Sequence, residues 1–475
     1  MLYLDNFLFL EYTICSLSNH MEVRMNIVIV GAGKLGRTLT KHLSFENHNI
    51  TIIDTKPTVV ENIVNEYDVM GYCGNGASYD TQKNAGVAKA NVLIATTASD
   101  EVNILCCLVA KKLGVKQTIA RVTSHEYAKQ VSLMSNELGI SMTVNPELDA
   151  ANEIVRILQF PNAIKVEHFA NGKVNLVEFK IEKGSILHNK SLIALREKLQ
   201  LNVLVCAVSR EGEVFIPKGN FVLHEGDNVY ITADAKSIVD FFKKLNILKD
   251  KLKSSMIIGG GKISYYTAQK LLSSGITVKI IEPNLDICND LSDILPKAMI
   301  INGDGTNHEL LFEEGLLSTD SLVSLTGMDE TNIIISSFAK AQNCGKVITK
   351  VNNANYGFII GNIGLDTVIS PVEISSSNII RYVRGMESTR GSEFKTLYRL
   401  VDNKVEALEF LISKKTSYTS IPLKDLKFKN DILLACIIRE NNIIIPSGKD
   451  TIEPLDTLII ITGNSFIKDV SDIMR

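Results

Sequence analysis

The sequence predicts an α/β protein built from two doubly wound parallel sheets, each followed by a smaller α+β domain. Three observations predict this fold class. Short apolar runs alternate with amphipathic helical patterns, the alternation occurs twice along the chain, and each copy ends in a strand-rich segment with frequent turn signals. Length alone, 475 residues, suggests about three domains. The duplication raises the expectation to four.

An internal repeat determines this architecture. Residues 26–54 and 254–282 carry a Gly-x-Gly-Lys loop and a terminal acid at a constant offset of 228 positions. After one inserted residue the offset becomes 229, and Asp227 and Asp456 still match at this offset. A register kept over this distance indicates duplication of one unit of about 225 residues.

The apolar runs of the first copy predict a parallel sheet. They are the segments 27–30, 50–54, 68–72, 91–96, 118–122 and 141–145. Uninterrupted apolar runs are typical of strands covered by helices on both faces, and their spacing suits right-handed β-α-β units. A helical segment near 147–160 then leads to a strand-rich part at about 164–245. The predicted domains are 25–160, 164–248, 252–388 and 395–475, after an N-terminal extension, 1–24, that fits no part of the pattern.

The loop after the first apolar run has the pattern of a dinucleotide-binding site. Gly31, Gly33 and Gly36 form a G-x-G-x-x-G sequence between a strand and a helical pattern, which is the context that gives this motif its meaning. Gly31 permits a tight turn, Gly33 lets backbone approach a pyrophosphate, and Gly36 allows close packing of helix and sheet. Asp54 ends the second strand, 18 residues after Gly36. A carboxylate there accepts hydrogen bonds from a ribose and repels a 2′-phosphate, which favours NAD over NADP.

Other polar residues follow predicted strands, at the edge where open α/β sheets bind ligands. Asn75 lies in a glycine turn that either closes over an adenine or is an ordinary turn. Thr97 has a hydroxyl suited to phosphate or ribose, and Ser99 or Asp100 is expected to cap the next helix. Arg121 either reaches the ligand phosphates or is a solvated charge.

The second copy has a related but altered loop. Gly259 and Gly261 are kept, Ser264 replaces the third glycine, and Glu282 supplies the ribose acid. Either a working second pocket or a degenerate structural copy is consistent with this pattern.

Composition excludes several function classes. Lys and Arg total 50 against 53 Asp and Glu, so nucleic acid is not expected as the main partner. The eight cysteines include no C-x-x-C pair, which argues against a disulfide framework or a thiolate metal site and fits a reducing compartment. We expect no metal and no transmembrane segment, because no uncharged apolar run approaches the roughly 20 residues that span a bilayer.

Catalytic residues are not expected. The sequence contains neither a G-x-S-x-G elbow nor a G-x-x-x-x-G-K-[ST] loop, and its Tyr266-x-x-x-Lys270 string falls on the helix after the second glycine loop rather than beside a nicotinamide. Three alternatives remain open from the residues: a nucleotide sensor, which the sequence favours, an NAD-dependent oxidoreductase with a cryptic substrate site, and a scaffold with vestigial pockets.

The loops, the D-E-x-N segments at 100–103 and 329–332 and the tandem duplication resemble the TrkA-type regulatory subunit of Trk potassium-uptake systems, built from RCK-N and RCK-C domains. The resemblance covers about 25–475 and implies Rossmann-like nucleotide-binding domains. By position, it implies nucleotide contacts at Gly31, Gly33, Lys34, Leu35, Asp54, Asn75, Ala77, Thr97 and Arg121, and near Gly259, Lys262, Glu282 and Asp304.

The same resemblance implies a function and a location. The expected ligands are NAD or NADH, with ATP or ADP as further possibilities. The expected partner is a separate membrane-embedded subunit that conducts potassium, and the expected assembly is a dimer or a tetrameric ring. The chain itself is expected on the cytoplasmic face of the cell membrane, peripherally attached.

Overall fold

The computed structural model describes residues 24–159, 163–170, 173–199, 203–246, 252–353, 356–365, 367–386, 392–400, 404–429, 431–440, 442–463, 467 and 469–474. The expected extension at 1–24 lies outside these residues except for Arg24. The chain forms two compact units. One runs to Ile119 and includes Asn136–Ser141, and the other contains Ala120–Ser135 and the chain from Met142 onward.

The first large sheet is the predicted parallel sheet. Its strands are β1 (Asn26–Val30), β2 (Asn49–Asp54), β3 (Met70–Cys73), β4 (Val92–Ala95), β5 (Gln117–Arg121) and β6 (Met142–Val144). They are arranged in the order β3-β2-β1-β4-β5-β6, and β1 pairs in parallel with both β2 and β4. The order reverses direction between β1 and β4, so the glycine loop after β1 lies at a topological switch point.

Helices connect these strands. They are α2 (Lys34–Phe45), α3 (Pro57–Tyr67), α4 (Tyr79–Asn84), α5 (Asp100–Lys112), α6 (His125–Leu133) and α7 (Ser135–Leu138). Ser99 caps α5 as predicted, because its Oγ accepts a hydrogen bond from the amide of Val102 at 3.2 Å. The third strand was expected at 68–72 but begins at Met70. Asp68 has a left-handed φ of 52° at the end of α3 and therefore cannot continue a strand.

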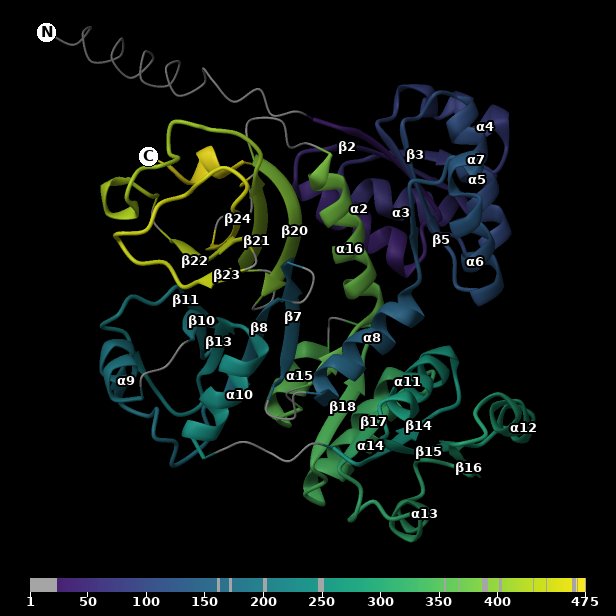
Figure 1. Cartoon of the computed structure of the whole chain (residues 1–475). Helices are drawn as coiled ribbons and strands as arrows, with labels where there is room; N and C mark the ends of the chain where they lie inside the picture. Colours follow the sequence, from purple (N-terminus) through teal and green to yellow (C-terminus); the bar gives the residue numbers. More distant parts are fainter. Residues whose placement is uncertain are drawn as a thin grey trace, which may run out of the picture. The chain divides into compact units, whose positions relative to one another are not determined.

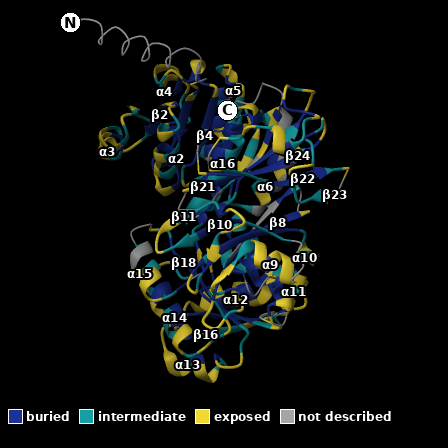
Figure 2. Cartoon of the chain, turned by 90° about the vertical axis from the view of Figure 1, so that its left-hand side faces the viewer, coloured by how far each residue is buried: buried dark blue, intermediate teal, exposed yellow. Residues whose placement is uncertain are grey.

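The second large sheet repeats the first. Its strands are β14 (Ser254–Ile258), β15 (Thr277–Glu282), β16 (Met299–Asn302), β17 (Ser321–Ser324), β18 (Lys346–Lys350) and β19 (Val368–Ile369), in the order β16-β15-β14-β17-β18-β19. The intervening helices are α11 (Lys262–Ser273), α12 (Leu285–Ile294), α13 (His308–Glu313), α14 (Asp329–Ala341) and α15 (Gly357–Asn362), seen around the strands in Figure 1. Strands are largely buried and helices keep exposed faces in Figure 2, as expected for a sheet covered on both sides.

A long helix follows each sheet. They are α8 (Pro146–Gln159), where the sequence predicted one, and α16 (Pro371–Gly385). The Asp149 carboxylate on α8 accepts hydrogen bonds from Ser375 Oγ at 3.1 Å and Asn378 Nδ2 at 3.0 Å, both on α16. Ile154 and Leu158 share a hydrophobic core with Leu271 of α11. These contacts join α8 to the second half of the chain.

The strand-rich segments form two antiparallel sheets. The first contains β7 (Lys165–Phe169), β8 (Val174–Lys180), β10 (Leu204–Arg210), β11 (Glu213–Phe215) and β13 (Asn228–Ala233). Beside it lie the two-stranded pair β9 (Lys190–Ser191) and β12 (Val222–Leu223) and the helices α9 (Leu192–Leu199) and α10 (Ala235–Lys244). The second contains β20 (Ser392–Leu400), β21 (Val405–Ile412), β22 (Ile432–Arg439), β23 (Asn442–Ile444) and β24 (Thr457–Thr462).

The two small sheets share one core. Phe169, Cys206 and Tyr230 of the first sheet and Ala407 and Cys436 of the second belong to the same cluster of buried side chains. The two large parallel sheets and the two small antiparallel sheets together confirm the predicted α/β class. The expected domain start at 395 falls inside β20, and the domain limits stay a prediction.

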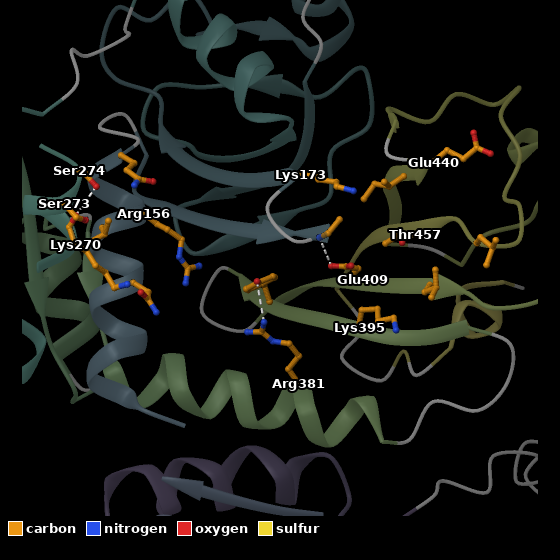
Figure 3. Close-up of a pocket in the computed structure, with 18 residues that line it drawn as sticks. Arg156, Lys173, Lys270, Ser273, Ser274, Arg381, Lys395, Glu409, Glu440 and Thr457 are labelled. Carbon is orange, nitrogen blue, oxygen red and sulfur yellow. Dashed lines mark hydrogen bonds between the residues drawn. The ribbon is translucent and has the colours of Figure 1, made fainter. Parts of the chain in front are cut away.

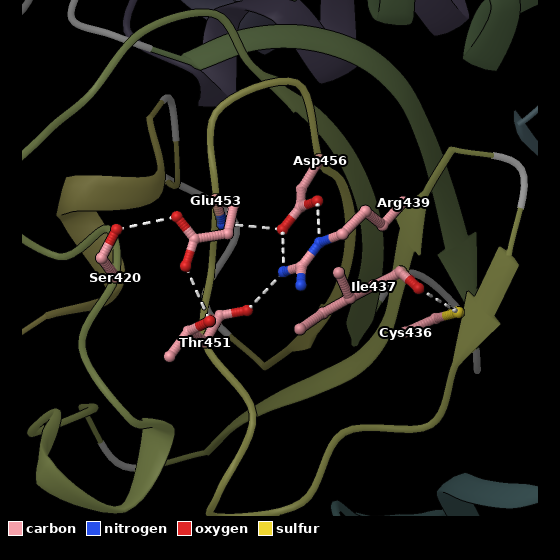
Figure 4. A network of polar contacts seen from close by, with 7 residues as sticks. All are labelled: Ser420, Cys436, Ile437, Arg439, Thr451, Glu453 and Asp456. Atoms are coloured by element: carbon pink, nitrogen blue, oxygen red, sulfur yellow. Dashed lines mark hydrogen bonds and ion pairs between the residues drawn. The ribbon is translucent and has the colours of Figure 1, made fainter.

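An arginine–aspartate clamp occurs in both small domains and explains one pair of repeated residues. In the second domain, Arg439 donates from Nε and Nη2 to the two oxygens of Asp456, both at 2.8 Å (Figure 4). In the first, Arg210 makes the same pair of bonds to Asp227, at 2.7 and 2.8 Å. Both aspartates are almost fully buried. Since a buried carboxylate needs a charged partner, the clamp accounts for the acid at this position in each copy.

Candidate functional site

The first glycine loop has the geometry of a phosphate cradle. Gly31 has a φ of 94°, and a Cβ there would lie 2.8 Å from the amide nitrogen of Thr97. A Cβ on Gly36 would lie 1.9 Å from the carbonyl oxygen of Gly31, so the sequence prediction of a close approach is correct and the contact is within the loop itself. A Cβ on Gly33 would meet nothing within 4 Å. Gly33 therefore borders open space, as the approach of a pyrophosphate requires.

Helix α2 begins at this open space. Gly33 is its N-cap residue, no side chain caps the helix, and the first turn contains no acid. The first amides of α2 and the positive end of its dipole are therefore available to an anion. Lys34 is exposed at the first helical position, whereas the Leu35 side chain is 6% exposed and packs in the core. A ligand contact at Leu35 would have to use backbone.

Asp54 lies beside the loop, as predicted for the ribose acid. Its Oδ2 accepts a hydrogen bond from the Ala32 amide at 2.7 Å, and its Oδ1 accepts one from the Lys56 amide at 3.0 Å. The side chain remains half-buried. Because each carboxylate oxygen can accept two hydrogen bonds, Asp54 can hold the loop and still accept from a ribose hydroxyl. The hydrogen bond to Ala32 was not predicted, because the motif specifies the acid and not its backbone partner.

The structure brings two further predicted segments to this edge. The Gly74 amide donates to the Asp54 carbonyl at 2.9 Å, which places Asn75 next to the ribose acid. Asn75 Oδ1 accepts from the Ala77 amide at 3.0 Å and so shapes the turn. Thr97 follows β4, and its amide and hydroxyl both donate to Asn103 Oδ1 at 2.8 Å. Asn103 is fully buried and fixes the Thr97 loop, a role that the helix pattern alone did not reveal.

Arg121 ends β5 as predicted. Its Nη2 lies 3.2 Å from Glu147 Oε1, and about a quarter of its side chain is exposed. Lys350 has the equivalent position in the second sheet, is 9% exposed, and donates from Nζ to the carbonyl of Thr326. Whether these cations contact a ligand stays a prediction.

The second glycine loop keeps the turn but differs around it. Gly259 has a φ of 101°, a Cβ on Gly261 would meet nothing within 4 Å, and Gly261 begins α11 without a side-chain cap. Ser264 is fully buried, and its hydroxyl has no hydrogen-bond partner among the described residues. The Glu282 carboxylate accepts from the Gly260 amide at 2.6 Å and is only 8% exposed. The predicted ribose acid of the second copy is thus less accessible than that of the first.

Two more features of the second loop bear on the predicted contacts. Asp304 is exposed and accepts from the amide and hydroxyl of Thr306, both at 2.9 Å, which repeats the turn at Asn75. Lys262 Nζ donates to Thr123 Oγ1 at 3.3 Å. Thr123 was not predicted, and no local signal marks it, because the contact joins positions 139 residues apart.

Neither a metal site nor a membrane-spanning helix is found in the residues that the structure describes. No group of three or more His, Cys, Asp or Glu side chains could hold a metal ion there. In the same ranges, no helix combines the length and apolarity needed to cross a lipid bilayer.

Comparison with known proteins gives the family. The TrkA-N domain model matches residues 27–146 and 255–371, and the TrkA-C domain model matches 176–246. A Trk system potassium uptake protein TrkA homolog from Archaeoglobus fulgidus is 32% identical over 452 residues, covering 95% of this chain and 100% of the relative. The chain belongs to the TrkA family. The Trk system potassium uptake protein TrkA of Haemophilus influenzae is 29% identical over 458 residues, with 95% and 98% coverage.

Solved structures agree with the fold of this TrkA family member. The GsuK channel matches with a TM-score of 0.62 and 16% identity, covering 94% of this chain and 78% of the other. A structure described as the GsuK channel bound to NAD matches with a TM-score of 0.61 and 16% identity, covering 96% and 81%. The family resemblance and the tandem Rossmann-like fold expected from the sequence are therefore confirmed. The residues that contact ligand stay a prediction.

Proposed function

We propose that this chain is the nucleotide-binding regulatory subunit of a Trk-type potassium uptake system, and that it controls a separate membrane-embedded subunit that conducts potassium. Nearly full-length similarity to proteins of that system supports the assignment. The observation that carries it is the first glycine loop, where open space at Gly33, an uncapped α2 and the half-buried Asp54 coincide.

The ligand that fits this loop best is NAD or NADH. The uncapped amides of α2 suit a pyrophosphate, and the Asp54 carboxylate suits an unmodified ribose while repelling a 2′-phosphate. ATP and ADP share the phosphate and ribose groups and are secondary candidates. The first loop is the stronger site, because Glu282 in the second is almost fully buried.

Regulation follows from differential binding. A ligand shifts a conformational equilibrium only by its difference in affinity for the two states. A tenfold difference supplies about 1.4 kcal/mol per site, and identical sites in a homo-oligomer would add their contributions. We propose that the nucleotide bound at α2 biases the arrangement of the nucleotide-binding domains and that the membrane subunit responds to that arrangement. The chain would act on the cytoplasmic side, attached through its partner, and would catalyse no reaction.

Growth at limiting potassium tests this function. Deletion of the gene should prevent growth, the unmodified gene should restore it, and a Gly33→Asp variant should fail, because a carboxylate would occupy the phosphate position. Gly361→Asp is a matched control, since a Cβ on Gly361 also meets nothing within 4 Å and the residue is exposed on α15, outside both glycine loops. Restoration by Gly33→Asp would contradict the proposal. Steady oxidation of NADH with a panel of carbonyl compounds would support the oxidoreductase alternative instead.

A further inference from the structure

A large cavity lies within the second compact unit, and no residue of either glycine loop lines it. It has a volume of about 1190 Å³. One side is formed by α8, the end of α11 and α16, and the other by strands of the second small domain and the β7–β8 turn (Figure 3). Ligand pockets commonly measure about 300–1,000 Å³, so the cavity has room for a ligand as large as a nucleotide.

Basic side chains outnumber acidic ones around this cavity. Five basic side chains line it: Arg156, Lys270 and Arg381 on the helices, Lys173 in the β7–β8 turn, and Lys395 on β20, where it pairs with Glu393. Two acids also line it, Glu409 on β21 and Glu440 directly after β22. Arg156, Lys270 and Arg381 line the same cavity from three different helices, α8, α11 and α16. Convergent like charges in a cavity raise the local concentration of anions.

Asn378 and an aromatic ring hold Arg381 in place, and the Asp149 carboxylate on α8 interacts with it electrostatically without forming an ion pair. Its Nη2 donates to Asn378 Oδ1 at 2.6 Å, and its guanidinium lies 4.6 Å from the centre of the Tyr398 ring. Its Nε is buried and has no hydrogen-bond partner among the described residues. No carboxylate in that part of the chain forms an ion pair with it. An arginine oriented by an amide and an aromatic ring keeps its full charge and an unused donor for an anion.

Lys270 adds a second cation that no acid neutralises. No ion pair or hydrogen bond of its ammonium is found within the described ranges, and the residue is half-buried at the last turn of α11. Ser273 and Ser274, which also line the cavity, donate their hydroxyls to the Lys270 carbonyl at 2.7 and 3.0 Å. Arg156 differs, because it pairs with Glu153 at 3.2 Å on its own helix.

We propose that this cavity binds a phosphate-bearing anion of nucleotide size as a second effector. Guanidinium and ammonium donors converging from three helices suit phosphate oxygens, which accept several charge-assisted hydrogen bonds at once. Such a ligand would connect α8, α11 and α16 to the second small domain. It would therefore act on the contacts between helices and small domains rather than on the glycine loops.

Calorimetry of the full chain with inorganic triphosphate tests the site. The background is Gly33→Asp/Gly261→Asp, which blocks both glycine loops at positions where a Cβ meets nothing within 4 Å. One binding event per chain is expected in this background. Lys270→Gln should weaken it on the order of five- to tenfold, and Arg381→Lys should also weaken it because the planar fork is lost. Lys236→Gln, which changes an exposed lysine on α10, is the matched control and should change nothing.

Three results would overturn the proposal. They are loss of triphosphate binding in the blocked background, equal affinities of the Lys270→Gln and Lys236→Gln variants, and equally tight binding of citrate, which would show no selectivity for phosphate. Circular dichroism and thermal melting of each variant ensure that a loss of binding is not a loss of fold. A failed test here would leave NADH binding at the first glycine loop untouched, so the two proposals are separable.

Discussion

The side chain of Glu282 lies against the backbone of Gly260 and, with Ile287 and Leu291, leaves no room there for a side chain. A Cβ built on Gly260 would lie 2.8 Å from Ile287 Cγ2 and 3.0 Å from both Glu282 Cγ and Leu291 Cδ1, and Glu282 Oε2 accepts the Gly260 amide at 2.6 Å. The first copy has the complementary pair, in which the shorter Asp54 accepts the amide of Ala32 at 2.7 Å. The acid and the residue between the glycines have therefore changed together.

This relationship predicts coupled mutations. Asp54→Glu should crowd the Ala32 methyl group and lower the free energy of unfolding by about 1–3 kcal/mol, the usual cost of overpacking. Ala32→Gly should relieve that crowding, so the double variant should be more stable than the sum of the two single changes by at least about 0.5 kcal/mol. Denaturant unfolding of the four proteins measures this coupling. Strictly additive effects would show that the two positions do not compete for space.

Substitutions of the first two glycines of the loop should have different effects on stability and on NADH binding. Gly31→Ala should destabilise the first domain by about 1–3 kcal/mol, because φ is 94° and the new Cβ would lie 2.8 Å from the Thr97 amide nitrogen. Gly33→Ala should leave stability within about 0.5 kcal/mol, since its Cβ meets nothing, yet should weaken NADH binding. Thermal melting and ligand titration of both variants check this. Normal NADH affinity in Gly33→Ala would place the pyrophosphate elsewhere.

Burial raises the pKa of Asp149, and its hydrogen bonds to Ser375 and Asn378 oppose this shift only in part. A carboxyl group whose pKa is higher in the folded state binds its proton more tightly there. Its contribution to stability is therefore fully present below the ordinary aspartate pKa and is lost as pH rises through the raised value. An asparagine does not titrate, so the Asp149→Asn variant should not lose stability in this way as pH rises. Its free energy of unfolding at pH 7 should therefore be higher than that of the unmodified chain.

Urea unfolding at several pH values tests the prediction for Asp149. The difference between the two proteins should grow as pH rises from below the ordinary aspartate pKa. Asp240→Asn is a control, because Asp240 is exposed on α10. A constant difference across the pH range would show that the asparagine acts through packing alone.

The cysteines should differ sharply in reactivity. Cys73 is exposed and is the residue of β3 that pairs with Asp54, so its alkylation should be fast and should be slowed by bound NADH. Burial raises the pKa of Cys106 and of Cys436 to about 12, so neither forms much thiolate at neutral pH. Mass spectrometry after iodoacetamide treatment measures each site. Equal labelling of Cys73 with and without NADH would place the ligand away from β3.

Much of the fold could be predicted because the duplication repeats local signals. Gly31 and Gly259 both adopt a positive φ, and Asp227 and Asp456 both bind a clamp arginine. The start of β3 was predicted too early. Asp68 is the C-cap residue of α3 and has a left-handed conformation, which no pattern of apolar residues in the sequence marks. The sequence could place Asp54 and Gly33 at the site because the motif specifies both.

Other parts of the site depend on contacts between distant segments. The bond from Lys262 to Thr123, the anchoring of Thr97 by Asn103, and the basic lining of the cavity each join side chains from separate elements. No periodic pattern in the sequence predicts such contacts between separate elements. Glu282 is almost fully buried whereas Asp54 is half-buried, and the motif alone does not predict this difference between the two glycine loops.

Titration of the purified chain with NADH is the most direct test of nucleotide binding at the first glycine loop. The unmodified chain should bind, Asp54→Ala should lose about tenfold or more in affinity, and Glu282→Ala should lose less. Glu61→Ala, an exposed acid on α3, should bind as the unmodified chain does. An Asp54→Ala variant that binds NADH as tightly as the unmodified chain, or a chain that binds no adenine nucleotide at all, would contradict a nucleotide site at this loop.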